Sequence, residues 1–273
     1  MKLVEPEVFV VAGTETDDEG ITAYLRHVGA LDWETDARSA IEFLPEFMGR
    51  LCYRSWRPKM NPNVTRVREG NDEYLGHILE VGHGSVIEHP VLTFVFADVS
   101  RVFTHELVRH RVGTAISQES LRFVRLVDIP FWIPGWARAD EELMKRVTSA
   151  DICPHCLEMR GILPRLGSLQ QWMAGHFGLD NEKVPFSEKK ARTSFMRRFA
   201  PEGVATTIGW SANLRTIRHV LESRTDPSAE EEIRLVFSKV GEIVMTRYPS
   251  LFGDYEVEIV NDLPHFKTVY RKV

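Results

Sequence analysis

Apolar and polar positions follow two different periods along the chain, which predicts a mixture of strands and helices. Residues 8–13 (VFVVAG) and 91–98 (VLTFVFAD) are short runs rich in Val, Phe and Thr, a composition typical of strands. Residues 204–210 (VATTIGW) fit either a strand or a buried helical segment. The acidic run at residues 14–20 (TETDDEG) predicts a solvated turn after the first strand.

Apolar residues at intervals of three and four predict that much of the remaining chain is helical. The predicted helices cover residues 39–57, 72–83, most of 140–175, 184–200 and 211–224. The first contains Pro45, which we place near its start or at a break, and the last has Ser211 or Asn213 as its cap. Residues 127–138 are predicted to be extended, because each proline disfavours helix at the residue before it.

A long helix is predicted near the C-terminal end of the sequence. Asp226 and Pro227 mark its start, Ser228 and Glu231 form a capping box, and Pro249 ends it. Its apolar stripe consists of Ile233, Val236, Phe237, Val240, Ile243 and Val244. Because no repeat, low-complexity tract or linker divides the sequence, we predict one α+β domain over residues 1–273, with more helix than sheet.

Composition excludes several classes of protein. A chain of 273 residues with 43% hydrophobic content can bury a sizeable core, and a net charge of −5 argues against nonspecific nucleic-acid binding. The sequence shows no secretory signal and no apolar run long enough to cross a bilayer, so no membrane association is expected. Three cysteines cannot form a disulfide framework, which favours reduced thiols and a cytoplasmic location.

The segment RHRVGTAISQESLRF at residues 109–123 carries an unusual concentration of basic and hydroxyl side chains. It overlaps the end of a predicted helix that Asp98 caps and that ends near Gly113. A solvated helix end explains Arg109 and Arg111 but not the residues that follow. Guanidinium groups, turn N–H groups and hydroxyls together bind phosphate or pyrophosphate. We therefore predict an anion site that contains Arg109, Arg111, Ser117, Ser120 and Arg122.

A second polar segment, GHGSVIEHP at residues 82–90, lies at a predicted helix-to-strand junction. Its glycines allow the backbone to approach a flat ligand closely, although the segment by itself fits a capped turn better than a site. His83 and Glu88 do not have the spacing of a zinc-binding helix, and no third ligand follows, so no metal is predicted.

Two weaker signals lie further along the chain. Arg215 and His219 share a face of the helix predicted at 211–224, and Arg224 closes that helix, where an arginine is usually only a partner of the helix dipole. The CPHC segment with Cys153 and Cys156 has no second CxxC and no preceding thioredoxin-like strand, so we assign it no redox, zinc or nucleophilic role.

Together these segments resemble the flavin-dependent thymidylate synthases, whose signature is Arg-His-Arg, seven residues, Ser, one residue and Arg. Here eight residues separate Arg111 from Ser120, so the segment is one residue longer than the family pattern. The segment GHGSVIEH matches an upstream family motif in order and distance. The family pattern Asn-x-Arg followed nine residues later by Arg fits Asn213, Arg215 and Arg224.

The resemblance extends over roughly residues 40–250 and includes an arginine with a proline four positions later, here Arg197 and Pro201. It implies helices packed on a mainly antiparallel sheet and a homotetramer whose active sites are shared between subunits. It also implies an enzyme that methylates C5 of dUMP, with methylenetetrahydrofolate as carbon donor, reduced FAD as hydride donor and NADPH as reductant. Nucleotide and folate are then its small-molecule partners, and no nucleic acid is expected.

The resemblance also assigns roles to residues. Arg224 is the catalytic residue that stabilises negative charge on the uracil, and Ser120, grouped with it, is a hydrogen-bonding contact of the substrate. The uridylate contacts are Glu106, Arg109, Gln118, Glu119, Ser120, Leu121, Arg122, Arg197 and Arg224. The FAD contacts are His83, Ser85, Glu88, Arg109, His110, Arg111, Gln118, Asn213, Arg215 and His219. Glu106 and His219 stand where the family commonly has glutamine and asparagine.

Three other readings stay open at this point. The longer signature segment is compatible with a UMP/dUMP C5-methylase of a specialised nucleoside pathway, since a bulge near the sugar would leave room for a 2′-hydroxyl. A noncatalytic nucleotide- or RNA-binding module would use only the arginine-rich segment, and the acidic net charge counts against it. A cysteine-dependent thymidylate synthase is disfavoured, because Cys153 and Cys156 lie outside any matching motif.

Overall fold

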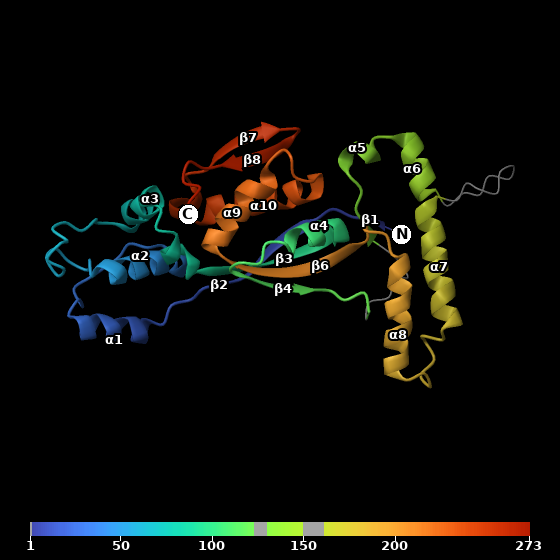
Figure 1. Cartoon of the computed structure of the whole chain (residues 1–273), viewed down its shortest axis with the longest axis horizontal. Coiled ribbons are helices and arrows are strands. Elements are labelled where there is room, and N and C mark those ends of the chain that lie inside the picture. Colours follow the sequence, from blue (N-terminus) through green and yellow to red (C-terminus); the bar gives the residue numbers. More distant parts are fainter. Residues whose placement is uncertain (1, 123–129, 150–160) are drawn as a thin grey trace. The chain divides into compact units, whose positions relative to one another are not determined.

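A computed structural model describes residues 2–122, 130–149 and 161–273 (Figure 1). These residues form two compact units, each assembled from segments that are distant in the sequence. The first unit consists of Met1–Glu7, Phe96–Arg109 and Ile116–Gly209, and the second of Val8–Val95, His110–Ala115 and Trp210–Val273. That residues 1–273 act as a single domain stays a prediction.

The described residues contain strands, α-helices and two short 3-10 helices. The strands are β1 (Lys2–Leu3), β2 (Glu7–Gly13), β3 (Val91–Ser100), β4 (Thr114–Gln118), β5 (Pro130–Phe131), β6 (Ala205–Asn213), β7 (Glu256–Val260) and β8 (Leu263–Lys267). The α-helices are α1 (Asp18–Val28), α2 (Ala40–Tyr53), α3 (Asn71–Val81), α4 (Arg101–Leu107), α5 (Gly135–Arg138), α6 (Glu141–Thr148), α7 (Ile162–His176), α8 (Phe186–Met196), α9 (Leu214–Thr225), α10 (Glu231–Arg247) and α11 (Pro249–Phe252). The 3-10 helices are η1 (Gly84–Glu88) and η2 (Arg197–Phe199).

The strands pair in three sheets. A four-stranded sheet has the order β2-β3-β6-β4, β1 pairs in parallel with β5, and β7 forms an antiparallel hairpin with β8. This mixture of helices with antiparallel sheet confirms the predicted α+β class. Within the described ranges, no helix combines the length and the apolar character that crossing a bilayer requires.

The core of the second unit lies between its sheet and the helices α9 and α10 (Figure 1). Buried and less buried residues alternate along β6, as expected for a strand with one face on a core. Trp210 of that strand contacts Phe94 of β3 and Phe237 of α10, with ring centroids 5.9 and 5.7 Å apart. All three side chains are inaccessible to solvent. This alternation and burial decide between the two readings of residues 204–210 in favour of a strand.

The first unit contains a separate small core where α7 meets α8. Met173, Leu179 and Met196 are buried there, and the Gln170 amide donates a hydrogen bond of 3.1 Å to the Met196 carbonyl. Two helices, α6 and α7, occupy the described part of the stretch predicted as mostly helical at 140–175. The CPHC segment lies outside the described residues.

The helix predicted from Asp98 to near Gly113 is shorter at both ends. Strand β3 continues through Asp98, which has a φ of 58°, and the side chain of Ser100 accepts the capping hydrogen bond from the Phe103 N–H. The helix ends at Leu107, so Arg109 lies beyond it and residues 114–118 form β4. The predicted cap and the predicted end were both wrong, because strand pairing extends past the capping signal.

The start predicted for the long C-terminal helix was also wrong. Glu230 caps α10 by accepting from the backbone of Glu232 and Ile233, whereas Asp226 accepts from the Ser228 N–H in a preceding turn. The start of α9 was predicted correctly in one of its two alternatives, since the Asn213 side chain accepts from the Thr216 N–H at 2.8 Å.

Other helix predictions differ from the structure in part. Helix α2 begins after its cap Ser39 and contains Pro45 within an unbroken helix, not at a break. Helix α1 begins inside the stretch predicted as a solvated turn, and α5 is helical within a stretch predicted as extended.

Strand β4 keeps one register along its length. The Asn213 N–H donates to the Gly113 carbonyl at 3.1 Å, and the Glu119 N–H donates to the Thr207 carbonyl at 2.9 Å. Both pairs belong to the same antiparallel register, so residues 113–119 contain no bulge.

Candidate functional site

The residues predicted to contact a uridylate lie in the first unit, with the exception of Arg224. Glu106 at the end of α4 forms an ion pair of 3.3 Å with Arg109. The amide of Gln118 donates to the Thr104 hydroxyl at 3.3 Å, which fixes that amide at the end of β4. The structure therefore holds two of these polar side chains through contacts with α4.

Beyond β4 the chain turns sharply. The hydroxyl of Ser120 accepts a hydrogen bond of 3.3 Å from the Arg122 N–H, and Leu121 is buried in a small cluster with Val204. The carbonyl of Arg122 accepts from the Thr193 hydroxyl of α8 at 2.8 Å. These contacts fix the backbone that follows Ser120.

The guanidinium of Arg122 contains a buried donor. Its Nε is buried and has no hydrogen-bond partner among the described residues. Because a buried donor without a partner is costly, this atom favours an anionic ligand as its partner. Arg197 in η2 and Glu119 after β4 are exposed.

The residues predicted to contact FAD lie in the second unit, with the exceptions of Arg109 and Gln118. Arg215 of α9 packs against η1, where a Cβ on Gly84 would lie 2.6 Å from its guanidinium carbon. Its Nη1 contacts Glu88 Oε1 at 2.5 Å, and its Nη2 donates to the Lys272 carbonyl at 3.1 Å. Ser85 is exposed next to this contact. Arg215 thus connects the Asn-x-Arg motif to the GHGSVIEHP segment.

Gly113 occupies a position that only glycine fits well. Its φ is 67°, and a Cβ there would overlap the Asn213 amide and would lie 2.6 Å from the Thr216 hydroxyl. The Thr216 hydroxyl also donates to the Val112 carbonyl at 2.8 Å. The turn after Arg111 is therefore fixed directly against the first turn of α9.

Arg224 and His110 are in direct contact. The Arg224 Nε lies 2.6 Å from the His110 Nε2, and both side chains are half-buried. The ring of His219, five residues earlier on α9, faces the His110 ring edge to face, with centroids 6.1 Å apart. The residue predicted to stabilise the uracil is therefore hydrogen-bonded to a residue predicted to bind flavin.

A cavity of about 440 Å³ lies beside His83, between the end of α2, the loop over residues 54–70 and α3. The Tyr53 ring stacks on the His83 ring at an interplanar angle of 15°, and the Tyr53 hydroxyl lies 2.9 Å from His83 Nε2. Burial raises the pKa of Tyr74, another lining residue, to about 12, so its phenol is neutral at physiological pH.

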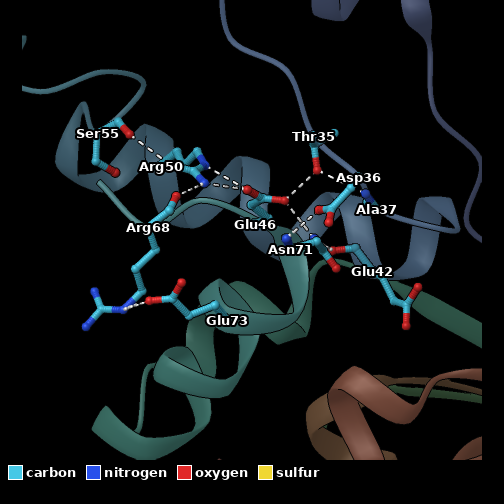
Figure 2. A network of polar contacts seen from close by, with 10 residues as sticks. All are labelled: Thr35, Asp36, Ala37, Glu42, Glu46, Arg50, Ser55, Arg68, Asn71 and Glu73. Atoms are coloured by element: carbon cyan, nitrogen blue, oxygen red, sulfur yellow. Dashed lines mark hydrogen bonds and ion pairs between the residues drawn. The ribbon is translucent and has the colours of Figure 1, made fainter. Parts of the chain in front are cut away.

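A buried polar network (Figure 2) includes Arg50, Ser55 and Arg68, which line this cavity. Glu46 accepts hydrogen bonds from Arg50, from the Thr35 hydroxyl at 2.7 Å and from the Asn71 amide at 2.7 Å. The Arg50 guanidinium also donates to the carbonyls of Ser55 and Arg68, at 3.1 and 2.9 Å. One buried arginine thus holds both ends of the loop that lines the cavity.

The predicted FAD contacts of the second unit supply several kinds of polar group. Arg111 and Arg215 supply guanidinium groups, Asn213 an amide, and His110 and His219 imidazoles. These groups fit a ligand that combines a diphosphate with a hydrogen-bonding heteroaromatic ring. In the described part of the chain, no cluster of three or more His, Cys, Asp or Glu side chains has an arrangement that could hold a metal ion.

Of the residues that line the cavity, only His83 carries a role predicted from the sequence. Residues 58–71 lie between two predicted helices, and this stretch carries Arg66 and Arg68 shortly before the GHG segment. The signal that could have identified them is the concentration of arginines in a stretch rich in proline and asparagine, where binding residues are common.

Comparisons with known proteins relate most of the chain to one family. The family described as thymidylate synthase complementing protein matches residues 36–250. A flavin-dependent thymidylate synthase from Mycobacteroides abscessus is 34% identical over 232 residues, which cover 85% of this chain and 86% of that protein. A protein of the same name from Corynebacterium diphtheriae is 33% identical over 234 residues, with 85% and 86% coverage.

Solved structures resemble the fold of the chain. Thymidylate Synthase X from Helicobacter pylori, solved with FAD and dUMP, aligns with a TM-score of 0.54 and 16% identity, covering 91% of this chain and 98% of that one. The UMP/dUMP methylase PolB from Streptomyces cacaoi, solved with 5-Br UMP, aligns with a TM-score of 0.54 and 13% identity, covering 93% and 95%. At these identities the likeness concerns the fold.

Proposed function

The chain belongs to the family of flavin-dependent thymidylate synthases, and from this premise we propose that it converts dUMP to dTMP. In this reaction C5 of the uracil loses a proton and gains a methyl group. Methylenetetrahydrofolate supplies the one-carbon unit and leaves as tetrahydrofolate. Reduced FAD, when bound, supplies the hydride and is oxidised, and NADPH reduces it again.

The observation that carries the proposal is the hydrogen bond between Arg224 and His110. It holds a guanidinium in a half-buried position, where a positive charge stabilises a developing anion more strongly than in water. Arg224 is the group that stabilises the charge that accumulates on the uracil ring when C5 becomes nucleophilic. No cysteine nucleophile takes part.

The FAD site uses the polar groups that the second unit supplies. Arg111 and Arg215 bind the pyrophosphate, and Asn213, His110 and His219 bind or orient the remainder of the cofactor. The other contacts are His83, Ser85, Glu88, Arg109 and Gln118. The close packing of Gly84 against Arg215 supports this assignment, because a side chain at that glycine would displace the guanidinium.

The uridylate site uses the residues around the turn after β4. Arg122 binds the phosphate through its guanidinium, whose buried Nε otherwise has no hydrogen-bond partner in the described part of the chain. Ser120 is a hydrogen-bonding contact of the substrate. The other contacts are Glu106, Arg109, Gln118, Glu119, Leu121 and Arg197. Arg224 contacts the uracil base.

The assembly and location form part of the same proposal. The enzyme acts as a homotetramer in the cytoplasm and shares each active site between subunits. The odd number of cysteines is consistent with a reducing compartment. A sizing column coupled to light scattering measures the subunit number, and a monomer that retains full turnover would contradict the shared site.

The test of the function is turnover by purified protein incubated with FAD. We expect a flavin absorbance spectrum, NADPH oxidation that requires both dUMP and methylenetetrahydrofolate, and dTMP as the product. A variant with Cys52, Cys153 and Cys156 replaced by serine retains most of this activity. Protein that binds no flavin contradicts the proposal, and protein that binds RNA or nucleotide without turnover is a binding module instead.

A further inference from the structure

The cavity beside His83 has a strongly cationic lining. Two exposed arginines, Arg66 and Arg68, line it together with His77 and His83. Among the described residues that line it, none is an aspartate or a glutamate. A cavity of about 440 Å³ has the size of a small-molecule site, and its charge selects for an anion.

Arg66 and Arg68 are the arginines of the cavity that a ligand can engage. Arg50 is buried, and Glu46 at 2.6 Å neutralises its charge (Figure 2). The Arg68 guanidinium lies 3.8 Å from Glu73, and both side chains are substantially exposed, so this pair is weak and a ligand carboxylate can replace Glu73. The Arg68 carbonyl, by contrast, is fixed by Arg50. The network thus positions the backbone of Arg68 and leaves its guanidinium available.

The lining of the cavity combines aromatic and apolar side chains with the arginines. The rings of Tyr53 and His83 are stacked, and His83 is also a predicted contact of FAD. Val64, Val67 and Val81 add apolar side chains to the lining. This combination suits a ligand with an aromatic body and an anionic tail.

The proposed reaction uses four ligands, which are FAD, the uridylate, the folate co-substrate and NADPH, and the residues assigned to the first two lie elsewhere. Of the residues assigned to FAD or to the uridylate, only His83 lines the cavity. We propose that the cavity binds the tail of the folate co-substrate, with the aminobenzoyl group near Tyr53 and His83 and the glutamate carboxylates on Arg66 and Arg68. This inference rests on the proposed function, and it predicts that the enzyme prefers folates with several glutamates.

The kinetic test compares folates that carry one and three glutamates. Each carboxylate that pairs with an exposed guanidinium adds up to about a fivefold gain in affinity, so the triglutamate has the lower KM in the holoenzyme. In the double variant Arg66→Ala with Arg68→Ala, the KM for either folate rises and the difference between them disappears. The kcat, the KM for dUMP and the flavin spectrum stay unchanged. Arg57→Ala is the matched control, because Arg57 is an exposed arginine of the same loop that does not line the cavity.

A binding measurement separates this inference from the proposed function. Isothermal titration of the FAD-loaded protein with p-aminobenzoyl-triglutamate requires no turnover, and we expect binding that the double variant loses and Arg57→Ala keeps. Unchanged folate KM values and unchanged titration in the double variant overturn the inference while dTMP synthesis persists. Loss of flavin or a raised KM for dUMP would assign the cavity to those ligands instead. Specific binding of the triglutamate without dTMP formation by the parent protein would refute only the proposed reaction.

Discussion

The Nε of Arg224 donates a hydrogen bond of 2.6 Å to the Nε2 of His110. Because this ring nitrogen accepts, His110 is neutral and carries its proton on Nδ1. A protonated His110 would lose the acceptor and place a second positive charge beside the guanidinium. The position of the charge that acts on the uracil therefore depends on a side chain assigned to the flavin.

Arg224→Ala removes that charge and is expected to abolish most turnover. Loss of a group that stabilises a transition-state anion costs about 2–4 kcal/mol, which lowers kcat roughly 30- to 1,000-fold. The flavin stays bound, because Arg224 is not among the residues assigned to the cofactor. Stopped-flow oxidation of the reduced enzyme with dUMP and folate measures the loss, and the absorbance spectrum measures the flavin content. Turnover equal to that of the parent would remove Arg224 from the mechanism.

Gly113→Ala tests the turn that joins the arginine segment to α9. The alanine is strained at a φ of 67°, and its Cβ overlaps the Asn213 amide that caps α9. Gly29→Ala is the matched control, since Gly29 has a φ of 70° and open space around its Cβ. In both variants, the strain of an alanine in the left-handed region lowers the free energy of unfolding by about 1–2 kcal/mol. Gly113→Ala lowers it by about 1 kcal/mol more, because it also disturbs the Asn213 cap.

Urea unfolding of the two glycine variants measures this difference, and a flavin titration shows whether moving Asn213 weakens cofactor binding. If both variants unfold at the same urea concentration, the contact between Gly113 and Asn213 does not stabilise the fold.

The network around Glu46 predicts a large loss of stability from one substitution. Glu46→Ala leaves the Arg50 guanidinium buried without its carboxylate and removes the acceptor of Thr35 and Asn71 (Figure 2). Breaking a buried pair in this way costs about 3–5 kcal/mol. Arg38→Ala breaks an exposed ion pair with Asp72 and costs less than about 1 kcal/mol. Thermal unfolding monitored by circular dichroism compares the two, and equal midpoints would contradict a stabilising network.

His265 on β8 makes stability depend on pH. Burial, followed by the charge of Lys267, lowers the pKa of His265 below its ordinary value of 6.5. At a pH between the pKa of His265 in the folded chain and its pKa in the unfolded chain, the unfolded chain binds more protons. The contribution of His265 to stability is therefore complete above about pH 6.5 and is lost as the pH falls. The pKa of Asp226, which Ser228 lowers, affects stability only at more acidic pH.

The measurement is the free energy of unfolding at pH 7 and at pH 5 for the parent and for His265→Gln. The parent loses more stability between these values than the variant does. His27→Gln, at an exposed position on α1, keeps the pH dependence of the parent. A variant at His265 with the slope of the parent would show that another group titrates.

Local signals in the sequence narrowed some elements to two alternatives. The Asn213 cap and the strand β6 depend on contacts within a few positions, and the sequence predicted each as one of two alternatives. Strand β3 overrides the capping signal at Asp98 because its pairing partners come from distant segments. The hairpin of β7 and β8 was not predicted, because much of β7 is exposed and its residues give no clear apolar run.

The same distinction between local and distant contacts applies to the candidate site. Its motifs could be read from the sequence because each lies in one short segment, such as residues 109–123. The contact of Arg224 with His110 joins residues 114 positions apart, and that of Asn71 with Glu46 joins residues 25 apart. Such distances leave no trace in local periodicity, so neither the coupling of Arg224 nor the cavity wall could be predicted.

The structure also bears on the choice between dUMP and UMP. The signature segment is one residue longer than the family pattern, and a bulge in it would leave room for a 2′-hydroxyl. Residues 113–119 instead keep one regular register against β6, and the Thr114 hydroxyl already donates to the His110 carbonyl at 3.0 Å. We therefore expect the enzyme to prefer dUMP to UMP. The segment forms no bulge that would make room for the 2′-hydroxyl of a ribose, and the Thr114 hydroxyl donates to the His110 carbonyl instead. A side-by-side assay of kcat/KM measures it, and a preference of about a thousandfold corresponds to roughly 4 kcal/mol. Comparable rates with UMP would show that the sugar is accommodated elsewhere and would make the chain a UMP/dUMP methylase.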